Sequence, residues 1–453
     1  MGNVYTSVRI LFAASLLWGA AAPARAQDVE PAQPLLKKDL QYLLQPSLES
    51  AGGAPALAEF YLGRNYELGA GVAVNYTEAR KYYRQAADAG DAKGQFALGY
   101  LDLRGLGAAQ DYGSALTWMM QAATQNNRDA QAWIGHIYQN GLGVPQDYGL
   151  AMKYYRLAAD QDYPAAQNNI GFMYQNGLGV SRDYNEAMAW YLRAAAADEP
   201  MANYNIGTLY EHGLGVKLNY TEALQYYRKA SGQGNAKAQA AIGSFYAKGL
   251  GIARDFAEAL KWYRMAEAAG EPAALNGLAS FHFYGLGVKR DQAIAMDYYR
   301  KAAATGFAEA QNNLGFLYQQ GLSVKRDYAE ALRWYKLAAA QDYAVAQYNI
   351  GILYARGYGV KQNMVEAIKH YRASAANGHF AAQYTLSTIY AEGQGVAKDL
   401  PRAKMWAEIA MRSGFEAAKL RHDGILQQMT PAQLTRAQDL VKRCIVSQIR
   451  DCG

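Results

Sequence analysis

Cysteine, histidine and proline are scarce in this chain of 453 residues, which contains 2 Cys, 6 His and 11 Pro. Two cysteines exclude a scaffold that is built on many disulfides. The histidines show no short spacing of the kind that metal ligands usually have. We therefore expect neither a metal centre nor a bound cofactor.

The excess of positive over negative charge is small, and long apolar runs are few. The formal net charge is +6, charged residues make up 19% of the chain, and hydrophobic residues make up 51%. This composition is typical of a soluble protein with a packed core, and so modest a charge argues against nucleic acid as a partner. After residue 26 no run reaches the roughly 18 apolar residues of a membrane span, so we expect none in the mature chain.

Residues 1–26 have the order of a secretory signal peptide. Arg9 precedes an apolar run over residues 10–22, and Ala24-Arg25-Ala26 forms a small-x-small cleavage site. The apolar run is short for a bilayer span, although an uncleaved anchor is the alternative. We expect cleavage near Ala26 and a mature protein that is periplasmic or secreted.

Repetition dominates the remainder of the sequence. A glycine or a small substitute recurs every 36 residues, and an alanine follows each of them 16 residues later. Ten such units cover residues 57–416. The recurring small residues are Gly63, Gly99, Gly135, Gly171, Gly207, Gly243, Ala279, Gly315, Gly351 and Ser387. A fixed period of this length predicts a solenoid.

Each unit contains the pattern of two helices around a glycine-rich turn. In the fourth unit, Ile170, Met173 and Tyr174 have helical spacing before the Gly-x-Gly turn. Asp183 and Glu186 then predict a capping box at the start of the second helix. The same box is predicted at Asn75/Glu78, Asn219/Glu222, Asp255/Glu258, Asp327/Glu330 and Asn363/Glu366. We predict an all-α solenoid superhelix of about ten antiparallel helix pairs, with a C-terminal capping helix.

The repeats resemble the Sel-1-like repeat family, a relative of the tetratricopeptide repeats. The motif that carries this resemblance combines Leu/Ile-Gly-x-x-Tyr, Gly-x-Gly-Val, Asp and Ala-x-x-Trp/Tyr-Tyr. The resemblance covers all ten units. It implies a right-handed superhelix that acts as a protein-binding scaffold. In bacteria, exported members of the family are linked to signalling, envelope assembly or contact with host proteins.

The two ends of the chain differ from the repeats. We interpret residues 27–56 as an N-terminal arm or loose cap. In residues 417–453, Thr430, Pro431 and Gln433 predict a capped helix that closes the last repeat. Cys444 and Cys452 are expected to pair in an exported protein, with free or intermolecular thiols as the alternative.

The sequence offers no convincing catalytic group. The Gly-x-Gly turns lack the preceding strand and third glycine of a dinucleotide loop. There is no Gly-x-Ser-x-Gly elbow, and both cysteines lie in the C-terminal tail. We therefore expect no enzyme activity.

The resemblance to tetratricopeptide hairpins implies that the first helix of each unit lines a concave groove. Amides and aromatic rings close to the repeat glycine would then face a protein partner. For Asn169, Asn205, Asn313 and Asn349, bonding between neighbouring helices is an equal alternative, because they share one consensus position. The predicted partner-binding residues are Tyr100, His136, Asn168, Asn169, Phe172, Gln175, Tyr204, Asn205, Asn312, Asn313, Phe316, Gln319, Tyr348, Asn349 and Tyr384.

Basic residues recur in the turn before the second helix of the later units. A fixed period would align them on one edge of the solenoid. A solvated ridge is the simpler interpretation, and weak contact with an acidic surface or a polysaccharide is the alternative. These residues are Lys217, Arg254, Lys289, Arg290, Lys325, Arg326, Lys361 and Lys398.

Together these features predict an exported, non-catalytic scaffold or adaptor that binds a protein through its concave face. Envelope signalling and polysaccharide production are processes that such an adaptor could regulate. One alternative is a secreted factor that binds a host molecule. A more distant one is an envelope protein that binds or hydrolyses glycans.

Overall fold

The computed structural model describes residues 55–447 and 452, and the described residues form 22 helices and no strand. The chain divides into two compact units between residues 238 and 239, inside helix α13 (Ala236–Lys248), and each unit is described by itself. The predicted signal peptide and nearly all of the predicted arm lie outside the described residues. The predicted all-α architecture of paired helices is confirmed.

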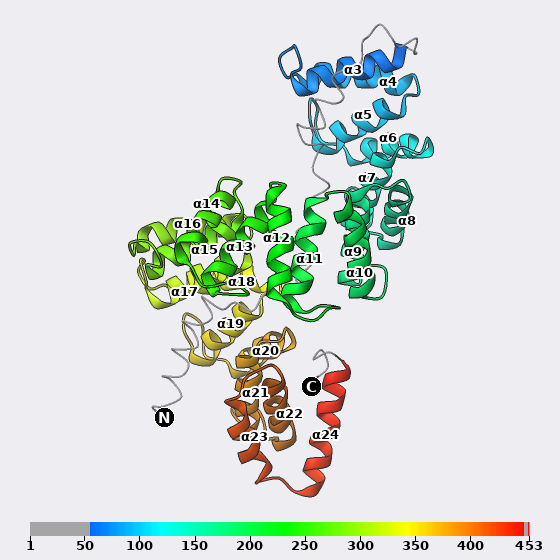
Figure 1. Cartoon of the computed structure of the whole chain (residues 1–453). Helices are drawn as coiled ribbons and strands as arrows, with labels where there is room; N and C mark the ends of the chain where they lie inside the picture. The colour runs from blue at the N-terminus through cyan, green and yellow to red at the C-terminus, as the bar shows by residue number, and fades with distance from the viewer. Residues whose placement is uncertain (1–54, 448–451, 453) are drawn as a thin grey trace. The chain divides into compact units, whose positions relative to one another are not determined.

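The N-terminal unit, residues 55–238, contains five helical hairpins, and each hairpin packs against the next (Figure 1). Its helices are α3 (Pro55–Leu68), α4 (Tyr76–Asp88), α5 (Ala92–Arg104), α6 (Tyr112–Thr124), α7 (Arg128–Asn140), α8 (Tyr148–Ala159), α9 (Pro164–Asn176), α10 (Tyr184–Ala196), α11 (Pro200–His212) and α12 (Tyr220–Gly232).

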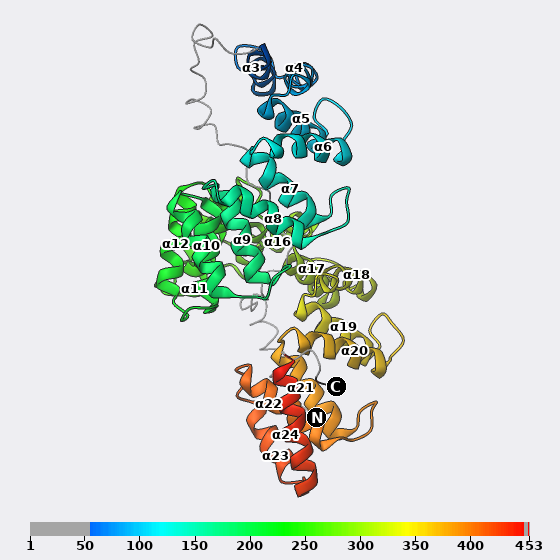
Figure 2. The same ribbon diagram turned by 90° about the vertical axis from the view of Figure 1, so that its right-hand side faces the viewer.

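The C-terminal unit, residues 239–452, continues the same pattern and ends in two additional helices (Figure 2). After α13 it contains α14 (Phe256–Glu267), α15 (Pro272–Tyr284), α16 (Gln292–Ala304), α17 (Ala308–Gln320), α18 (Tyr328–Ala339), α19 (Ala344–Arg356), α20 (Met364–Ala376), α21 (Phe380–Glu392), α22 (Leu400–Arg412), α23 (Ala418–Leu426) and α24 (Pro431–Val446).

The alanine that recurs in the second helix of each repeat explains how closely the two helices of a hairpin pack. All ten of these alanines are fully buried, among them Ala151 in α8 and Ala331 in α18. Their small side chains let the two helices of a hairpin approach one another, and the surrounding tyrosines and leucines fill the remaining space. The core of each unit is therefore a row of small clusters, one for each pair of neighbouring hairpins.

The predicted N-caps are correct, but the reciprocal half of the predicted capping boxes is absent. Asp183 Oδ1 accepts hydrogen bonds from the backbone N–H groups of Asn185 and Glu186. The backbone N–H of Asp183 donates to Tyr174 O (3.0 Å), so it has no free donor for the Glu186 side chain. The full box forms only at Thr430 and Gln433, among the described helices, at the start of α24.

Aromatic rings alternate with a period of two repeats. The second helices of the even-numbered repeats carry tryptophan at the position where the odd-numbered repeats carry tyrosine or histidine. In the odd-numbered repeats this ring stacks on a ring of the first helix, as in Tyr138–Tyr154 (6.2 Å between centroids) and Tyr354–His370 (5.8 Å). The packing unit is therefore a pair of hairpins. The tryptophans are Trp118, Trp190, Trp262, Trp334 and Trp406.

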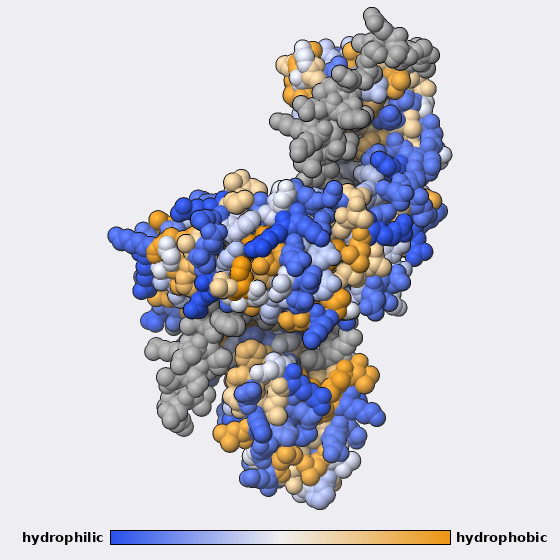
Figure 3. All heavy atoms as spheres, viewed as in Figure 1, coloured by the Kyte–Doolittle hydropathy of each residue, from blue (hydrophilic) through white to orange (hydrophobic). Residues whose placement is uncertain are grey.

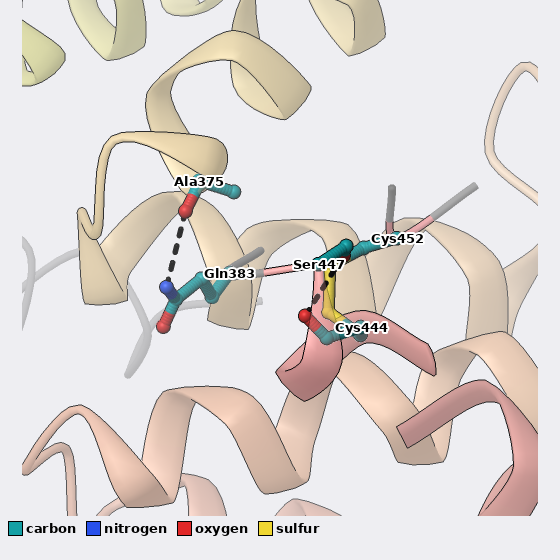
Figure 4. Close-up of a disulfide and its surroundings, with 5 residues drawn as sticks. All are labelled: Ala375, Gln383, Cys444, Ser447 and Cys452. Atoms are coloured by element: carbon teal, nitrogen blue, oxygen red, sulfur yellow. Dashed lines mark hydrogen bonds between the residues drawn. A yellow bond between two sulfur atoms is a disulfide. The ribbon is translucent and has the colours of Figure 1, made fainter. Parts of the chain in front are cut away.

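Helices α23 and α24 close the C-terminal end of the array, as the sequence predicted for α24. Ala437, Val441 and Cys444 of α24 are buried, and Val441 and Cys444 join the core to which α21 and α22 contribute. Cys444 and Cys452 lie together with their Cα atoms 4.6 Å apart and their sulfur atoms joined (Figure 4). Both side chains are buried, and the same view shows Gln383 of α21 donating a hydrogen bond to Ala375 O.

Candidate functional site

The face formed by the first helices, here called the first-helix face, carries pairs of asparagines that join neighbouring repeats. In the N-terminal unit, Asn205 Nδ2 donates to Asn168 Oδ1 (2.9 Å). In the C-terminal unit, Asn313 donates to Asn276 (3.0 Å), and Asn349 donates to Asn312 (2.9 Å). The alternative interpretation of Asn205, Asn313 and Asn349 as helix-bonding residues is therefore confirmed.

Asn169, which occupies the same consensus position, has a different partner. It is buried and hydrogen-bonds with the hydroxyl group of Tyr155, in the second helix of the preceding repeat. The position that holds the accepting asparagine in the other pairs is Ala132 in that preceding repeat, so no amide is present there to complete an asparagine pair. Asn169 thus also stabilises contact between repeats.

Gln175 and Gln319 lie inside their hairpins. Gln175 Oε1 accepts a hydrogen bond from Tyr191 Oη (2.8 Å), and Gln319 Oε1 accepts one from Tyr335 Oη (2.7 Å). Both glutamines are less than a tenth exposed. This location corrects the prediction that they face a partner: each one satisfies a buried tyrosine hydroxyl group, which would otherwise carry a desolvation cost.

Three rings meet on the first-helix face of the N-terminal unit. Tyr100 and His136 each lie edge-on to Trp133, with centroids 5.3 Å apart in both pairs. Burial lowers the pKa of His136 to about 4, so its imidazole is neutral near pH 7. Tyr100 is half-buried, whereas His136 is buried and its Nδ1 lies 3.0 Å from Asn140 Nδ2.

The remaining predicted aromatic residues of the two units are half-buried. Phe172 in α9 and Tyr204 in α11 belong to the N-terminal unit, and Tyr204 lies against Tyr227 (5.6 Å between centroids). Phe316 belongs to α17 of the C-terminal unit. Each of these rings keeps part of its surface available to a ligand, so their role in partner binding remains a prediction.

A second group of rings lies between α19 and the start of α23 in the C-terminal unit. Tyr348 contacts His379, and His379 lies beside Phe380 (centroid distances 4.9 and 5.7 Å). Phe415 links Phe380 to Tyr384 (5.1 and 5.3 Å). The guanidinium of Arg421 lies over the Tyr384 ring, 5.3 Å from its centroid. The structure thus connects the predicted residues Tyr348 and Tyr384 through rings that the sequence analysis did not select.

Sequence reasoning missed Trp133, His379, Phe380 and Phe415. Trp133 lies two residues before Gly135, at a position that was already considered for other repeats, so the repeat alignment could have identified it. His379, Phe380 and Phe415 lie where one repeat passes into the next. No consensus position marked them, because their contacts depend on the path of the connecting turns.

Other parts of the described chain offer no obvious reactive centre. No group of three or more His, Cys, Asp or Glu side chains in it is placed to hold a metal ion. An open groove of about 550 Å³ lies among α22, α23 and α24, lined by Lys404, Glu408 and Arg412 among others, and it includes none of the predicted residues. None of the described helices is long and apolar enough to cross a bilayer.

Comparison with known sequences and structures agrees with this geometry. The Sel1 repeat matches the chain ten times, at residues 56–91, 92–127, 128–163, 164–199, 200–235, 236–271, 272–307, 308–343, 344–379 and 380–415. No match was found among curated proteins.

Two solved structures are similar over long stretches. One is the protective antigen c5321 of uropathogenic Escherichia coli, with 31% identity over 88% of this chain and 85% of that one, and a TM-score of 0.51. The other is a Sel1 repeat protein of Oxalobacter formigenes, with 34% identity over 54% of this chain and 96% of that one, and a TM-score of 0.45. The chain therefore belongs to the Sel1-repeat family, whose members are generally non-catalytic protein-interaction scaffolds.

Proposed function

We propose that this protein is an extracytoplasmic adaptor that holds a protein partner against its first-helix face. The observation that supports this proposal best is that the first helices of each unit carry half-buried rings, in particular Phe172 in α9 of the N-terminal unit and Phe316 in α17 of the C-terminal unit. Rigid rings with one side packed and the other accessible supply contact area at little entropic cost, which is why aromatic residues are frequent at binding hot spots. The asparagine pairs keep neighbouring first helices in register.

The predicted signal peptide and the paired cysteines support a location outside the cytoplasm for this adaptor. A disulfide between Cys444 and Cys452 persists where the environment is oxidising. Two measurements test the location: the N-terminal residue of the mature protein, expected to be Gln27, and its recovery in periplasmic extract. An N-terminus at Met1 together with a cytoplasmic location would contradict this part of the proposal.

The binding face is tested with paired variants. The exported chain is used to capture partners from the native envelope, and the affinity of the purified partner is then measured for Phe172→Ala/Phe316→Ala. Truncation of binding anchors costs on the order of 2 kcal/mol or more, so we expect an affinity loss of roughly 30-fold or more.

The matched control is Leu192→Ala/Leu337→Ala. These leucines are exposed apolar residues on the second helices α10 and α18, one in each unit. We expect this variant to bind normally. Unchanged affinity of the phenylalanine variant, with normal unfolding, would exclude the first-helix face as the binding surface.

A secreted protein that contacts a host molecule is the second candidate. The specific observation in its favour is the similarity to the protective antigen c5321 over most of both chains. Accumulation in the culture medium rather than in periplasmic extract would favour this candidate over an envelope adaptor.

A further inference from the structure

Five turns of the C-terminal unit present basic residues at equivalent positions. The turns comprise residues 252–254, 288–290, 324–326, 360–362 and 396–398, and together they are called the basic edge. All of their lysines and arginines are exposed, and none forms an ion pair with a described residue. The basic residues of this edge are Arg254, Lys289, Arg290, Lys325, Arg326, Lys361 and Lys398.

The fold does not require a charge at these positions. The residue that corresponds to Arg290 and Arg326 is glutamine in three other turns of the chain, at Gln110, Gln146 and Gln362. There the side-chain Nε2 donates to a carbonyl of the preceding helix end, at distances of 2.7, 2.7 and 2.9 Å. A neutral side chain therefore supports the same turn, although Arg254 and Arg326 also lie over the rings of Phe256 and Tyr328.

The carboxylates closest in sequence are committed to the helices that follow. Asp291 Oδ1 accepts hydrogen bonds from the N–H groups of Ala293 and Ile294 (2.9 and 3.0 Å), and Asp327 does the same for Ala329 and Glu330. A carboxylate at a helix N-terminus interacts favourably with the partial positive charge there. These aspartates offset the charge of the edge only in part, because seven basic residues stand against four cap aspartates.

An aromatic pair with one exposed and one half-buried ring lies next to the cations. The ring of Tyr358, which is 40% exposed, stacks on Tyr328 with centroids 4.9 Å apart. The Arg326 guanidinium lies 5.7 Å from the centroid of the same Tyr328 ring. A flat ring can pack against the C–H face of a sugar, and a guanidinium can bind a carboxylate through two parallel hydrogen bonds. These are the two groups that a uronic acid unit presents.

We infer that the basic edge binds a linear, carboxylated polysaccharide. A ligand that spans several turns needs anionic groups at regular intervals along an extended chain, and the Tyr358–Tyr328 pair adds a surface that suits a sugar ring. A membrane surface is less well matched, because the five segments themselves contain none of the exposed large hydrophobic side chains of the described residues, although Tyr358, Val365 and Ile294 lie within four residues of them in sequence. This site is separate from the first-helix face.

The direct test measures binding of the full mature chain to polygalacturonate at low and physiological salt. The test variant replaces Lys289, Arg290, Lys325 and Arg326 with glutamine, the residue that already occupies this turn elsewhere. The matched control replaces Lys261, Lys301, Arg333 and Lys369 with glutamine; these are exposed cations on the second helices of the same unit, and each is paired with a nearby acid.

We expect the edge variant to lose at least tenfold in affinity and the control, with the same net charge, to change less than twofold. Wild-type binding should weaken as salt rises, because the Debye length shortens. Failure of the wild type to bind, or equal losses in the two variants, would overturn the proposal.

Other polymers identify the class of ligand. Tyr358→Ala should weaken binding to polygalacturonate by at least threefold and leave binding to polyglutamate unchanged, because only the sugar uses the ring. Preferential binding of the wild type to polyglutamate, or to vesicles of phosphatidylglycerol, would overturn the polysaccharide assignment in favour of an acidic protein or a membrane. Phe172→Ala/Phe316→Ala should bind polygalacturonate normally, so failure of the first-helix proposal can be told apart from failure of this one.

Discussion

Gly315 in α17 lies so close to the ring of Tyr335 in α18 that a Cβ atom at residue 315 would stand 2.6 Å from the ring's Cδ1. The same relationship joins Gly171 to Tyr191 and Gly351 to Tyr371. Where the glycine is replaced by serine, at Ser387, the residue at the tyrosine position is Ala407. In these three repeats the glycine therefore leaves the space that the facing tyrosine ring fills, whereas the seventh repeat accommodates Ala279 in the core that contains Tyr299.

We predict that Gly315→Ala destabilises the protein. The added methyl group has no space unless Tyr335 moves, and overpacking of this kind costs about 1–3 kcal/mol. The control is Gly424→Ala in α23, where a Cβ would meet nothing within 4 Å. There the higher helix propensity of alanine should stabilise the helix by about 0.5–1 kcal/mol. Urea unfolding of both variants measures the contrast, and similar shifts in the two would argue against the steric explanation.

The hydrogen bond between Tyr335 and Gln319 leads to a second prediction. Either Tyr335→Phe or Gln319→Met leaves one buried polar group without its partner, at a cost of about 1–3 kcal/mol. The double variant removes both groups, so it should be destabilised by clearly less than the sum of the single variants. A double-mutant cycle by chemical denaturation measures this coupling. Strict additivity would show that the bond contributes nothing.

Much of the fold could be predicted from the sequence because the repeat preserves its signals in ten copies. Glycine, alanine and the cap residues recur at fixed places, and each has a local physical cause. The placement of Gln175 and Gln319 could not be obtained in this way, because first-helix position alone does not say which neighbour a side chain meets. A signal was nevertheless present: a glutamine or glutamate at this position accompanies a buried tyrosine 16 residues later, as in Gln139/Tyr155 and Glu211/Tyr227.

The candidate site was harder to predict than the fold for a related reason. The rings of His379, Phe380 and Phe415 meet through the turns that connect repeats, and these turns vary in sequence. The basic edge was easier to predict than these rings, because its residues recur at fixed positions of the repeat. The structure added the observation that Gln110, Gln146 and Gln362 support the same turn without charge.

His136 leads to a prediction about pH. Burial lowers its pKa to about 4 from the ordinary value of 6.5, so the unfolded chain takes up the proton first as the pH falls. The stabilising contribution of this residue is complete above pH 6.5 and is lost as the pH falls toward 4. Between pH 7.5 and 4.5 the wild type should lose about 2 kcal/mol more stability than His136→Phe, which keeps the ring beside Trp133. Equal losses in the two proteins would contradict the lowered pKa.

The last prediction concerns His282, which stands where the other odd-numbered repeats have a tyrosine. Its ring stacks on Tyr298 (5.9 Å between centroids), as the tyrosines do on their partners, but its buried Nδ1 has no hydrogen-bond partner among the described residues. His282→Tyr keeps the stacking and removes the unsatisfied nitrogen, and the half-buried site leaves the new hydroxyl group within reach of water. We expect a gain of about 1 kcal/mol in the free energy of unfolding. The reverse change, Tyr138→His in the third repeat, should destabilise by a similar amount. A loss of stability in His282→Tyr would show that the histidine has a partner that only the native repeat supplies.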